Sequence, residues 1–390
     1  MSVVVSATGA DRWRYGHPWI YRSDVTKEPG DAPGIVPVND RRGRFLGHAL
    51  YSPKSEIRLR LLTRDPAPIT ADWWRGRIAQ ALAARDGITA TAYRVVHGEG
   101  DGLPSLVVDR YGSYVVVQLL SAGLEQARAD VLAGIAAVLQ PAGILLRNDA
   151  PVRRHEGLPS EVVVAAGAMP EVVEVEEDGI KYLAAPRTGQ KTGAFLDQRE
   201  NRALIGTASR PGGRALDLFA YHGSFALHLA RRAREVVAVD SSADALARGA
   251  ENAALNGLTN IVWREANAFD LLRDLERRGE QFDTVVLDPP AFAKTKTSVP
   301  RALAGYKEIN LRAMRLLAPG GLLLTCSCSF HVRREPFVKM LADAAADSGR
   351  RLQLLTLAGA GRDHPEVVTI PETGYLKGAL LRAAGGAAVD

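Results

Sequence analysis

Three aspartates in the second half of the chain, Asp217, Asp240 and Asp288, each stand at or near the end of a short apolar run. The run before Asp288, Phe282–Leu287, is followed by two prolines, which end a strand because they lack the N–H donor. Such bounded runs predict buried parallel strands. Ligands of open α/β sheets bind at the carboxyl ends of strands, so we expect the three carboxylates to line one rim. Each acid alone is equally consistent with an ordinary strand end or a helix cap; their joint arrangement favours a ligand site.

The residues around Asp217 predict the first strand-to-helix turn of this sheet, Asp217-Leu218-Phe219-Ala220-Tyr221-His222-Gly223-Ser224. The turn has a single glycine, so it is not the Gly-x-Gly-x-x-Gly dinucleotide fingerprint, and no Gly-Lys-Ser/Thr follows, so it is not a phosphate loop. A tight turn without a phosphate cradle indicates a nucleoside ligand that lacks a pyrophosphate. Asp240 follows this turn at about the sequence separation expected for an acid that binds the ribose.

The chain has only two cysteines, Cys326 and Cys328. One residue of separation would strain a disulfide, and two thiols are too few for a tetrahedral metal site, so no metal is expected. In an extended segment both side chains point to the same face, so alternation does not separate them. Cys326 continues an apolar strand as a small core residue, whereas Cys328 lies beyond it between two serines. Either one of the two thiols is a nucleophile, or both are inert and buried.

The elements that must position these groups follow a change of pattern along the chain. Residues 1–70 show short strands at 19–21, 45–51 and 57–62 and predict a small β-barrel. Residues 71–175 predict an α+β domain with helices at 71–85 and 124–139 and a hairpin around Gly112. Residues 176–390 alternate strands and helices, which predicts a doubly wound sheet, with a helix at 306–317. The fold class is therefore α/β, preceded by two smaller domains.

Arginines interleave with aromatic residues near the N-terminus, where Arg12 and Arg14 stand among Trp13, Tyr15 and Trp19. This pattern can grip unpaired bases, although Trp19 is better explained as a core residue. Residues 1–75 hold twelve Lys and Arg against eight Asp and Glu, which is +4 of the net +5. A second basic segment, expected to be a loop beside the predicted ligand rim, contains Lys294, Lys296 and Arg301. These residues are candidates for RNA phosphates, and a solvated basic surface is the alternative. The charged cluster 153–157 predicts a solvated loop, and a phosphate contact is the alternative.

Composition places few further limits. Hydrophobic residues make up 46% and charged residues 24% of the chain, as in ordinary globular proteins. No apolar run reaches membrane-spanning length, and the first residues lack the features of a signal peptide. We therefore expect a cytoplasmic protein without a membrane partner. The sequence does not decide its oligomeric state between monomer and homodimer.

Several motifs together resemble the bacterial large-subunit ribosomal RNA cytosine-C5 methyltransferases, a family of class I S-adenosylmethionine-dependent enzymes. The motifs are Gly189-Gln190-Lys191-Thr192-Gly193-Ala194-Phe195-Leu196-Asp197-Gln198-Arg199-Glu200-Asn201-Arg202, Asp288-Pro289-Pro290-Ala291-Phe292 and Ser327-Cys328-Ser329. The resemblance covers the whole chain and implies an N-terminal PUA domain, S-adenosylmethionine as cofactor and ribosomal RNA as partner.

The resemblance also implies roles for individual residues. Cys328 would be the nucleophile that adds to cytosine C6, and Asp288 would contact cytosine N3 and its amine. The cofactor would be bound by Asp217, Phe219, Tyr221, Gly223, Asp240 and Asn267, together with Phe195, Gln198 and Arg199 from the long motif. Arg199 and Arg202 are equally consistent with structural ion pairs.

Two positions depart from the pattern. Some RNA cytosine-C5 methyltransferases carry Pro-Cys where this chain has Pro289-Pro290, so the group that assists product release is not identified. Asn267 stands where the family usually has an acid near the adenine amine; its amide oxygen can accept the same hydrogen bond without the charge. The rival functions are an RNA methyltransferase that acts on another base or RNA, and a non-catalytic RNA-binding assembly factor with a retained cofactor fold.

Overall fold

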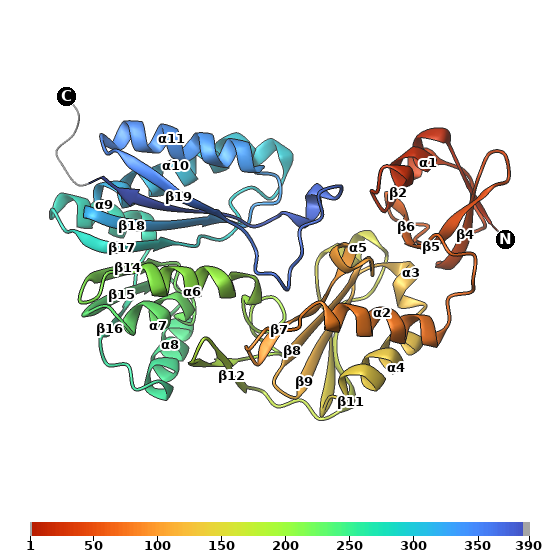
Figure 1. The fold of residues 1–390 in the computed structure, drawn as a ribbon, viewed down its shortest axis with the longest axis horizontal. Coiled ribbons are helices and arrows are strands. Elements are labelled where there is room, and N and C mark those ends of the chain that lie inside the picture. The colour runs from red at the N-terminus through yellow and green to blue at the C-terminus, as the bar shows by residue number, and fades with distance from the viewer. Residues whose placement is uncertain (1, 385–390) are drawn as a thin grey trace. The chain divides into compact units, whose positions relative to one another are not determined.

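The computed structural model describes residues 2–384, which form two compact units (Figure 1). The first unit comprises the chain up to Val175 together with Ala184–Leu196 and Arg362–Thr373. The second unit comprises Glu176–Leu183, Asp197–Gly361 and the chain from Gly374 onward. A two-stranded sheet of β12 (Val173–Glu177) and β13 (Ile180–Ala184) lies where the chain passes from one unit to the other. The division into domains at 1–70, 71–175 and 176–390 stays a prediction.

The first unit begins with a six-stranded sheet in the order β2-β6-β5-β4-β1-β3. Its core contains Val5, Trp13, Ile20 and Leu59. The prediction that Trp19 fills this core is wrong: its ring is partly exposed, and its Nε1 donates to Glu99 Oε1 at 2.8 Å. The elements are β1 (Val3–Val5), α1 (Ala7–Arg14), β2 (Trp19–Tyr21), β3 (Val25–Lys27), β4 (Gly34–Asp40), β5 (Phe45–Tyr51) and β6 (Ile57–Thr63), with a 3₁₀ turn at Arg22–Asp24.

A five-stranded sheet follows in the order β11-β10-β9-β8-β7, and helices pack against it. The hairpin predicted around Gly112 joins β8 to β9, with Tyr111 opposite Tyr114. The helix predicted at 124–139 is two helices, α3 and α4. The elements are α2 (Ala71–Ala83), β7 (Ala92–His97), β8 (Leu106–Tyr111), β9 (Tyr114–Leu119), α3 (Ala122–Glu125), α4 (Arg128–Leu139), β10 (Gly143–Asn148), α5 (Val152–His155) and β11 (Glu161–Gly167), with 3₁₀ turns at Gly98–Asp101 and Pro371–Thr373.

The prediction of a solvated loop at 153–157 is wrong for Arg153 and Glu156, whereas Arg154 and His155 are exposed. Arg153 and Glu156 are buried within and just after the short helix α5. Glu156 pairs with Arg60 at 2.8 Å, and Arg153 pairs with Glu125 at 2.9 Å. The two charges are buried because partners distant in sequence satisfy them, which a local pattern does not reveal.

The second unit is built on a seven-stranded sheet in the order β16-β15-β14-β17-β18-β20-β19 (Figure 1). The first five strands of this order run parallel, and β20 pairs antiparallel with both β18 and β19. The strands are β14 (Arg214–Leu218), β15 (Glu235–Asp240), β16 (Ile261–Glu265), β17 (Phe282–Leu287), β18 (Leu317–Ser327), β19 (Leu352–Ala358) and β20 (Lys377–Ala383). The predicted α/β sheet is confirmed.

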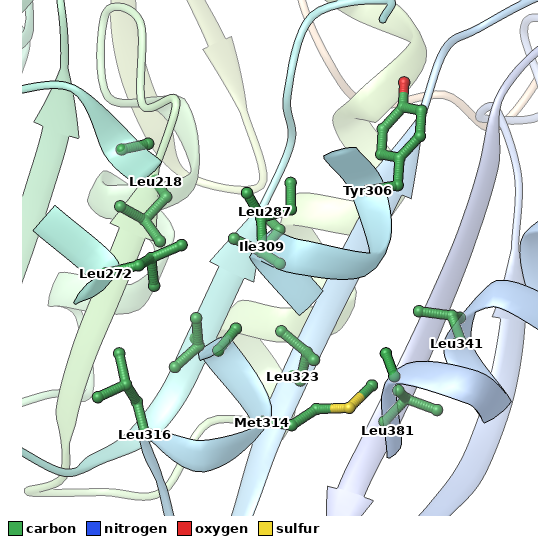
Figure 2. Close-up of a cluster of buried hydrophobic side chains, with 14 of the residues drawn as sticks. Leu218, Leu272, Leu287, Tyr306, Ile309, Met314, Leu316, Leu323, Leu341 and Leu381 are labelled. Atoms are coloured by element: carbon green, nitrogen blue, oxygen red, sulfur yellow. The ribbon is translucent and has the colours of Figure 1, made fainter. Parts of the chain in front are cut away.

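Helices cover both faces of this sheet, so alternate strand residues enter two cores. Leu216, Val285 and Leu323 pack with α9, α10 and α11, whereas Ala215 and Val286 pack with α6 and α7. Figure 2 shows the first core, where Leu218, Leu287 and Leu323 meet Leu272, Ile309 and Met314. The helices are α6 (Arg199–Ala208), α7 (Ser224–Ala230), α8 (Ala243–Leu255), α9 (Ala268–Arg277), α10 (Val299–Arg315) and α11 (Arg334–Ser348), with 3₁₀ turns at Leu196–Gln198 and Lys296–Ser298.

One helix begins earlier than the sequence indicated. The predicted helix 306–317 starts at Val299, because Pro300 occupies the first turn, where its missing N–H costs nothing. Arg301 is therefore helical rather than part of a loop. Among the described residues, no helix is long and apolar enough to span a membrane.

Candidate active site

The three predicted carboxylates meet at the carboxyl edge of the second unit's sheet. Strand β14 lies between β15 and β17, with Leu218 opposite both Val239 and Leu287. Asp240 and Asp288 each follow those partners by one residue, so they stand at the same level of the sheet. Both carboxylates lie close enough to Asp217 for their charges to add to the larger effect of burial in raising its pKa.

Asp217 is the most constrained of these acids. It is fully buried, and its Oδ2 accepts a hydrogen bond from the backbone N–H of Ala226 at 2.9 Å. Burial, followed by the charges of Asp288 and Asp240, raises the pKa of its carboxyl well above the usual value. No described residue hydrogen-bonds its Oδ1. A buried polar atom of this kind points to a partner that a ligand supplies.

The turn after β14 holds an unusual backbone. Phe219, Tyr221 and Gly223 all have left-handed φ angles of +65°, +50° and +81°. Non-glycine residues rarely adopt this region, and such outliers gather at functional sites. Asp240 fixes the turn, because its Oδ2 accepts from the Tyr221 N–H at 2.9 Å. A side chain at Gly223 would also meet the ring of Trp263 at 2.4 Å, so the close approach there requires glycine.

These features fit an S-adenosylmethionine molecule at this edge. Its ammonium and sulfonium groups are cationic, and three neighbouring carboxylates that repel one another favour a cation. Its hydroxyl and ammonium donors match the carboxylate Oδ1 of Asp217 and the partly exposed carboxylate of Asp240. The turn offers no phosphate cradle, which agrees with a nucleoside that lacks a pyrophosphate.

Asp288 is held by a residue from the long motif. Gln198 Nε2 donates to Asp288 Oδ1 at 2.8 Å, and Asn201 Nδ2 orients the amide by donating to Gln198 Oε1 at 2.6 Å. Gln198 and Asn201 are buried, whereas Asp288 is only partly buried. The sequence assigned Gln198 to the cofactor; its observed partner is the carboxylate expected to contact the target base.

The two cysteines differ as their positions in the sequence predicted, one within the apolar strand and one beyond it. Cys326 is fully buried in the core on the α6–α7 face, and burial followed by the charge of Asp288 raises the pKa of its thiol. Cys328 lies beyond the strand and is partly exposed, with its Sγ 3.9 Å from the carbonyl oxygen of Pro289. The structure therefore brings Cys328 to the Asp288-Pro289 turn.

The segment around Cys328 is fixed by residues that the sequence did not single out. Ser329 Oγ is 2.8 Å from the hydroxyl of Tyr306, and it accepts a hydrogen bond from the Ala293 N–H at 3.1 Å. Lys377 Nζ donates to the Ser329 carbonyl at 2.7 Å.

Other predicted cofactor residues have mixed surroundings. The Asn267 side-chain oxygen caps α9 by accepting from the N–H groups of Phe269 and Asp270, at 2.9 and 3.4 Å. Arg199 lies in the first turn of α6 and is 3.4 Å from Glu200. Phe195 belongs to the first unit, where Lys191 Nζ lies 4.7 Å from its ring centroid. Their roles toward the cofactor stay predictions.

Arg202 has a structural role. Both it and Glu177 are buried, and the guanidinium binds both carboxylate oxygens of Glu177. Glu177 also accepts from the hydroxyl of Tyr182 at 3.4 Å, and His228 Nε2 lies 3.8 Å away. This bidentate pair explains Arg202 as a buried ion-pair partner.

The predicted RNA contacts lie on accessible surface. Lys294 and Lys296 are exposed between β17 and α10. Arg12 pairs with Asp24 at 3.1 Å, and Arg14 pairs with Asp11 at 3.1 Å. Within residues 2–384, no group of three or more His, Cys, Asp or Glu side chains is arranged to hold a metal ion.

Two family models match the chain: a PUA-like domain over residues 3–64 and an S-adenosylmethionine-dependent methyltransferase over residues 123–367. The ribosomal RNA large subunit methyltransferase I of Tolumonas auensis is 40% identical over 94% of this chain and 95% of that protein. The protein of the same name from Salmonella arizonae is 38% identical over 94% of this chain and 93% of its own length.

Solved structures agree on the fold. A Streptococcus mutans chain described as an S-adenosylmethionine-dependent methyltransferase superposes with a TM-score of 0.84 at 20% identity, covering 98% of this chain and all of that one. A methyltransferase structure complexed with SAH gives a TM-score of 0.85 at 21% identity, with 98% and 100% coverage. The family match and the identities together show that this chain belongs to the S-adenosylmethionine-dependent methyltransferase family that includes the ribosomal RNA large subunit methyltransferases I.

Proposed function

We propose that this protein methylates C5 of a cytosine in large-subunit ribosomal RNA through a covalent adduct with Cys328. The observation that carries the proposal is the position of Cys328 beside the Asp288-Pro289 turn, while Cys326 is buried. The N-terminal PUA-like domain and the names of the full-length relatives support ribosomal RNA as the substrate.

The chemistry requires a nucleophile because cytosine C5 alone attacks a methyl group poorly. The thiolate of Cys328 adds to C6, and the electron pair of the C5–C6 double bond makes C5 nucleophilic. When bound, S-adenosylmethionine supplies an electrophilic methyl group on a sulfonium. After C5 is methylated, a base removes the C5 proton, the C5–C6 double bond re-forms, and the C6–S bond breaks to release the thiolate.

The neighbouring residues serve binding and orientation in this proposal. Asp288, held by Gln198, binds the Watson–Crick edge of the target cytosine. Asp217 and Asp240 bind the cofactor beside the turn that carries Tyr221. The exposed Lys294 and Lys296, and in the first unit Arg12 and Arg14, supply phosphate contacts that are independent of sequence.

The direct test uses large-subunit ribosomal RNA that contains 5-fluorocytidine. Fluorine at C5 cannot leave as a proton does, so a methylated adduct stays bound to the enzyme and survives denaturing electrophoresis. We expect trapping by the unmodified protein and by Cys326→Ala, and none by Cys328→Ala. Calorimetry with S-adenosylmethionine checks that Cys328→Ala retains its cofactor site.

Every other outcome of these experiments supports one of the alternative functions. Methyl transfer without trapping, or full activity of Cys328→Ala, would exclude the covalent mechanism and favour methylation of another base or atom. Cofactor binding with neither trapping nor transfer would favour an RNA-binding assembly factor. Mapping of 5-methylcytosine in ribosomal RNA from a strain that lacks the gene then identifies the nucleotide.

A further inference from the structure

Lys377, the first residue of β20, is 2% exposed and lies beside the segment that carries Cys328. In the antiparallel pair of β18 and β20, Lys377 is opposite Ser327, so it is the cross-strand neighbour of the residue before Cys328. Lysine is rarely this buried unless it is paired. A buried ammonium at this place therefore needs an explanation.

The hydrogen bonds of Lys377 fix its position without neutralising its charge. Its Nζ donates to the backbone carbonyls of Ser329 at 2.7 Å and of Tyr375 at 2.6 Å. An ammonium has three hydrogens, and these bonds use two of them. Among the described residues, no carboxylate forms an ion pair with Lys377. Neutral acceptors thus hold the ammonium at the backbone of Ser329, the residue that follows Cys328.

The charges around Lys377 make Cys328 the matching anion. Burial, which removes the ammonium from water, acts with the charges of Arg334 and Arg333 to lower the pKa of Lys377 to about 8. The interaction that opposes these effects is with Cys328. Tyr306 and Cys326 also interact electrostatically with Cys328, and neither is a cation.

We propose that Lys377 is a positioning residue whose ammonium group stabilises the thiolate of Cys328. The contacts between β18 and β20 support the pairing of Lys377 with Cys328. Its role in catalysis depends on the proposed function, which requires a thiolate. A cation beside a cysteine favours the reactive form of the thiol. Lys377 thereby prepares the nucleophile without touching the RNA base.

The test measures the thiolate directly, without RNA or cofactor. In a Cys326→Ala background, which leaves one thiol, the rate of alkylation by iodoacetamide is followed against pH by mass spectrometry. We expect a midpoint for Cys328 below about 8.5, the ordinary pKa of cysteine. Lys377→Met should raise this midpoint by at least about one unit, which is a tenfold loss of thiolate below the midpoint.

Two controls separate charge from structure. Lys339→Met removes an exposed lysine from the same unit and should leave the midpoint unchanged. Lys377→Arg retains a cation and should return the midpoint toward that of the parent protein. An unchanged midpoint in a folded Lys377→Met protein would overturn the inference. If that variant does not fold, a parent midpoint at or above about 8.5 overturns it equally.

The alkylation result and the trapping result are independent. A shifted midpoint without 5-fluorocytidine trapping would leave the ion pair standing and reject the proposed function. Trapping by the parent protein, together with an unshifted midpoint in Lys377→Met, would support the proposed function and reject the ion pair.

Discussion

The hydrogen bond from Gln198 to Asp288 gives a sharp prediction, because the sequence and the structure assign Gln198 to different partners. Gln198→Leu keeps a side chain of similar bulk but removes both the donor to Asp288 and the acceptor for Asn201. Asn201 Nδ2 retains its second acceptor, the Gly359 carbonyl at 3.0 Å. The substitution should therefore remove one hydrogen bond that orients the Asp288 carboxylate while α6 remains packed.

The size of the effect follows from the geometry. A hydrogen bond to a charged group contributes about 1.5–3 kcal/mol, and the 2.8 Å distance is typical of a charge-assisted bond. Asp288 is partly exposed, so water replaces some of the lost interaction, and we expect a value near the lower end. At about 1.4 kcal/mol per tenfold change, kcat/KM for RNA should fall about 10- to 30-fold.

The assay combines steady-state methyl transfer with calorimetric binding of S-adenosylmethionine. If Gln198 orients Asp288, kcat/KM falls and the cofactor Kd changes by less than about threefold, which is under 1 kcal/mol. Gln198→Glu places a second carboxylate beside Asp288 and should reduce the activity further at neutral pH, because like charges repel. Gln353→Leu, at an exposed position of β19, is the matched control. A weaker cofactor Kd with unchanged turnover would refute the positioning role and restore the assignment made from sequence.

Two further predictions concern buried charges in the second unit. Arg202→Met should lower the free energy of unfolding, measured in urea, by about 3–5 kcal/mol, because it leaves Glu177 buried without its partner. Replacing both residues by apolar ones should recover most of that loss. Equal losses in the single and double variants would contradict this explanation. Asp217→Asn should stabilise the ligand-free protein at pH 8: an acid whose pKa is raised in the fold contributes stability below its unfolded pKa that is lost as pH rises through the folded pKa. Thermal melts from pH 5 to 9 should show a flatter profile for Asp217→Asn, and parallel profiles would reject the raised pKa.

The sequence predicted the features that depend on local pattern. The apolar runs placed Asp240 and Asp288 at strand ends, and the structure brings these strands together on either side of β14. The single glycine after Asp217 predicted a tight turn, and Gly223 has a left-handed φ of +81° there. Periodicity and turn chemistry are short-range signals, so they survive without knowledge of the fold.

The sequence did not predict features that depend on partners far along the chain. Gln198 and Asp288 are 90 positions apart, and no local pattern links an amide to a carboxylate at that separation. The local pattern predicts solvated charges at Arg153 and Glu156 for the same reason, since their partners Arg60 and Glu125 lie in other elements. Long-range polar contacts are set by topology, which a single sequence specifies only through the whole fold.

The position of Lys377 shows how topology alone can complete a site. Strand β20 runs antiparallel to β18, so it begins at the edge where β18 ends. A parallel strand would begin at the opposite edge and would carry its first residues away from Cys328. The antiparallel insertion therefore delivers both Tyr375, whose hydroxyl donates to Asp197 at 2.7 Å, and Lys377 to the carboxyl edge. Two residues near the chain's end reach a site built from the middle of the chain because one strand reverses direction, and the thiolate proposed for Cys328 depends on that reversal.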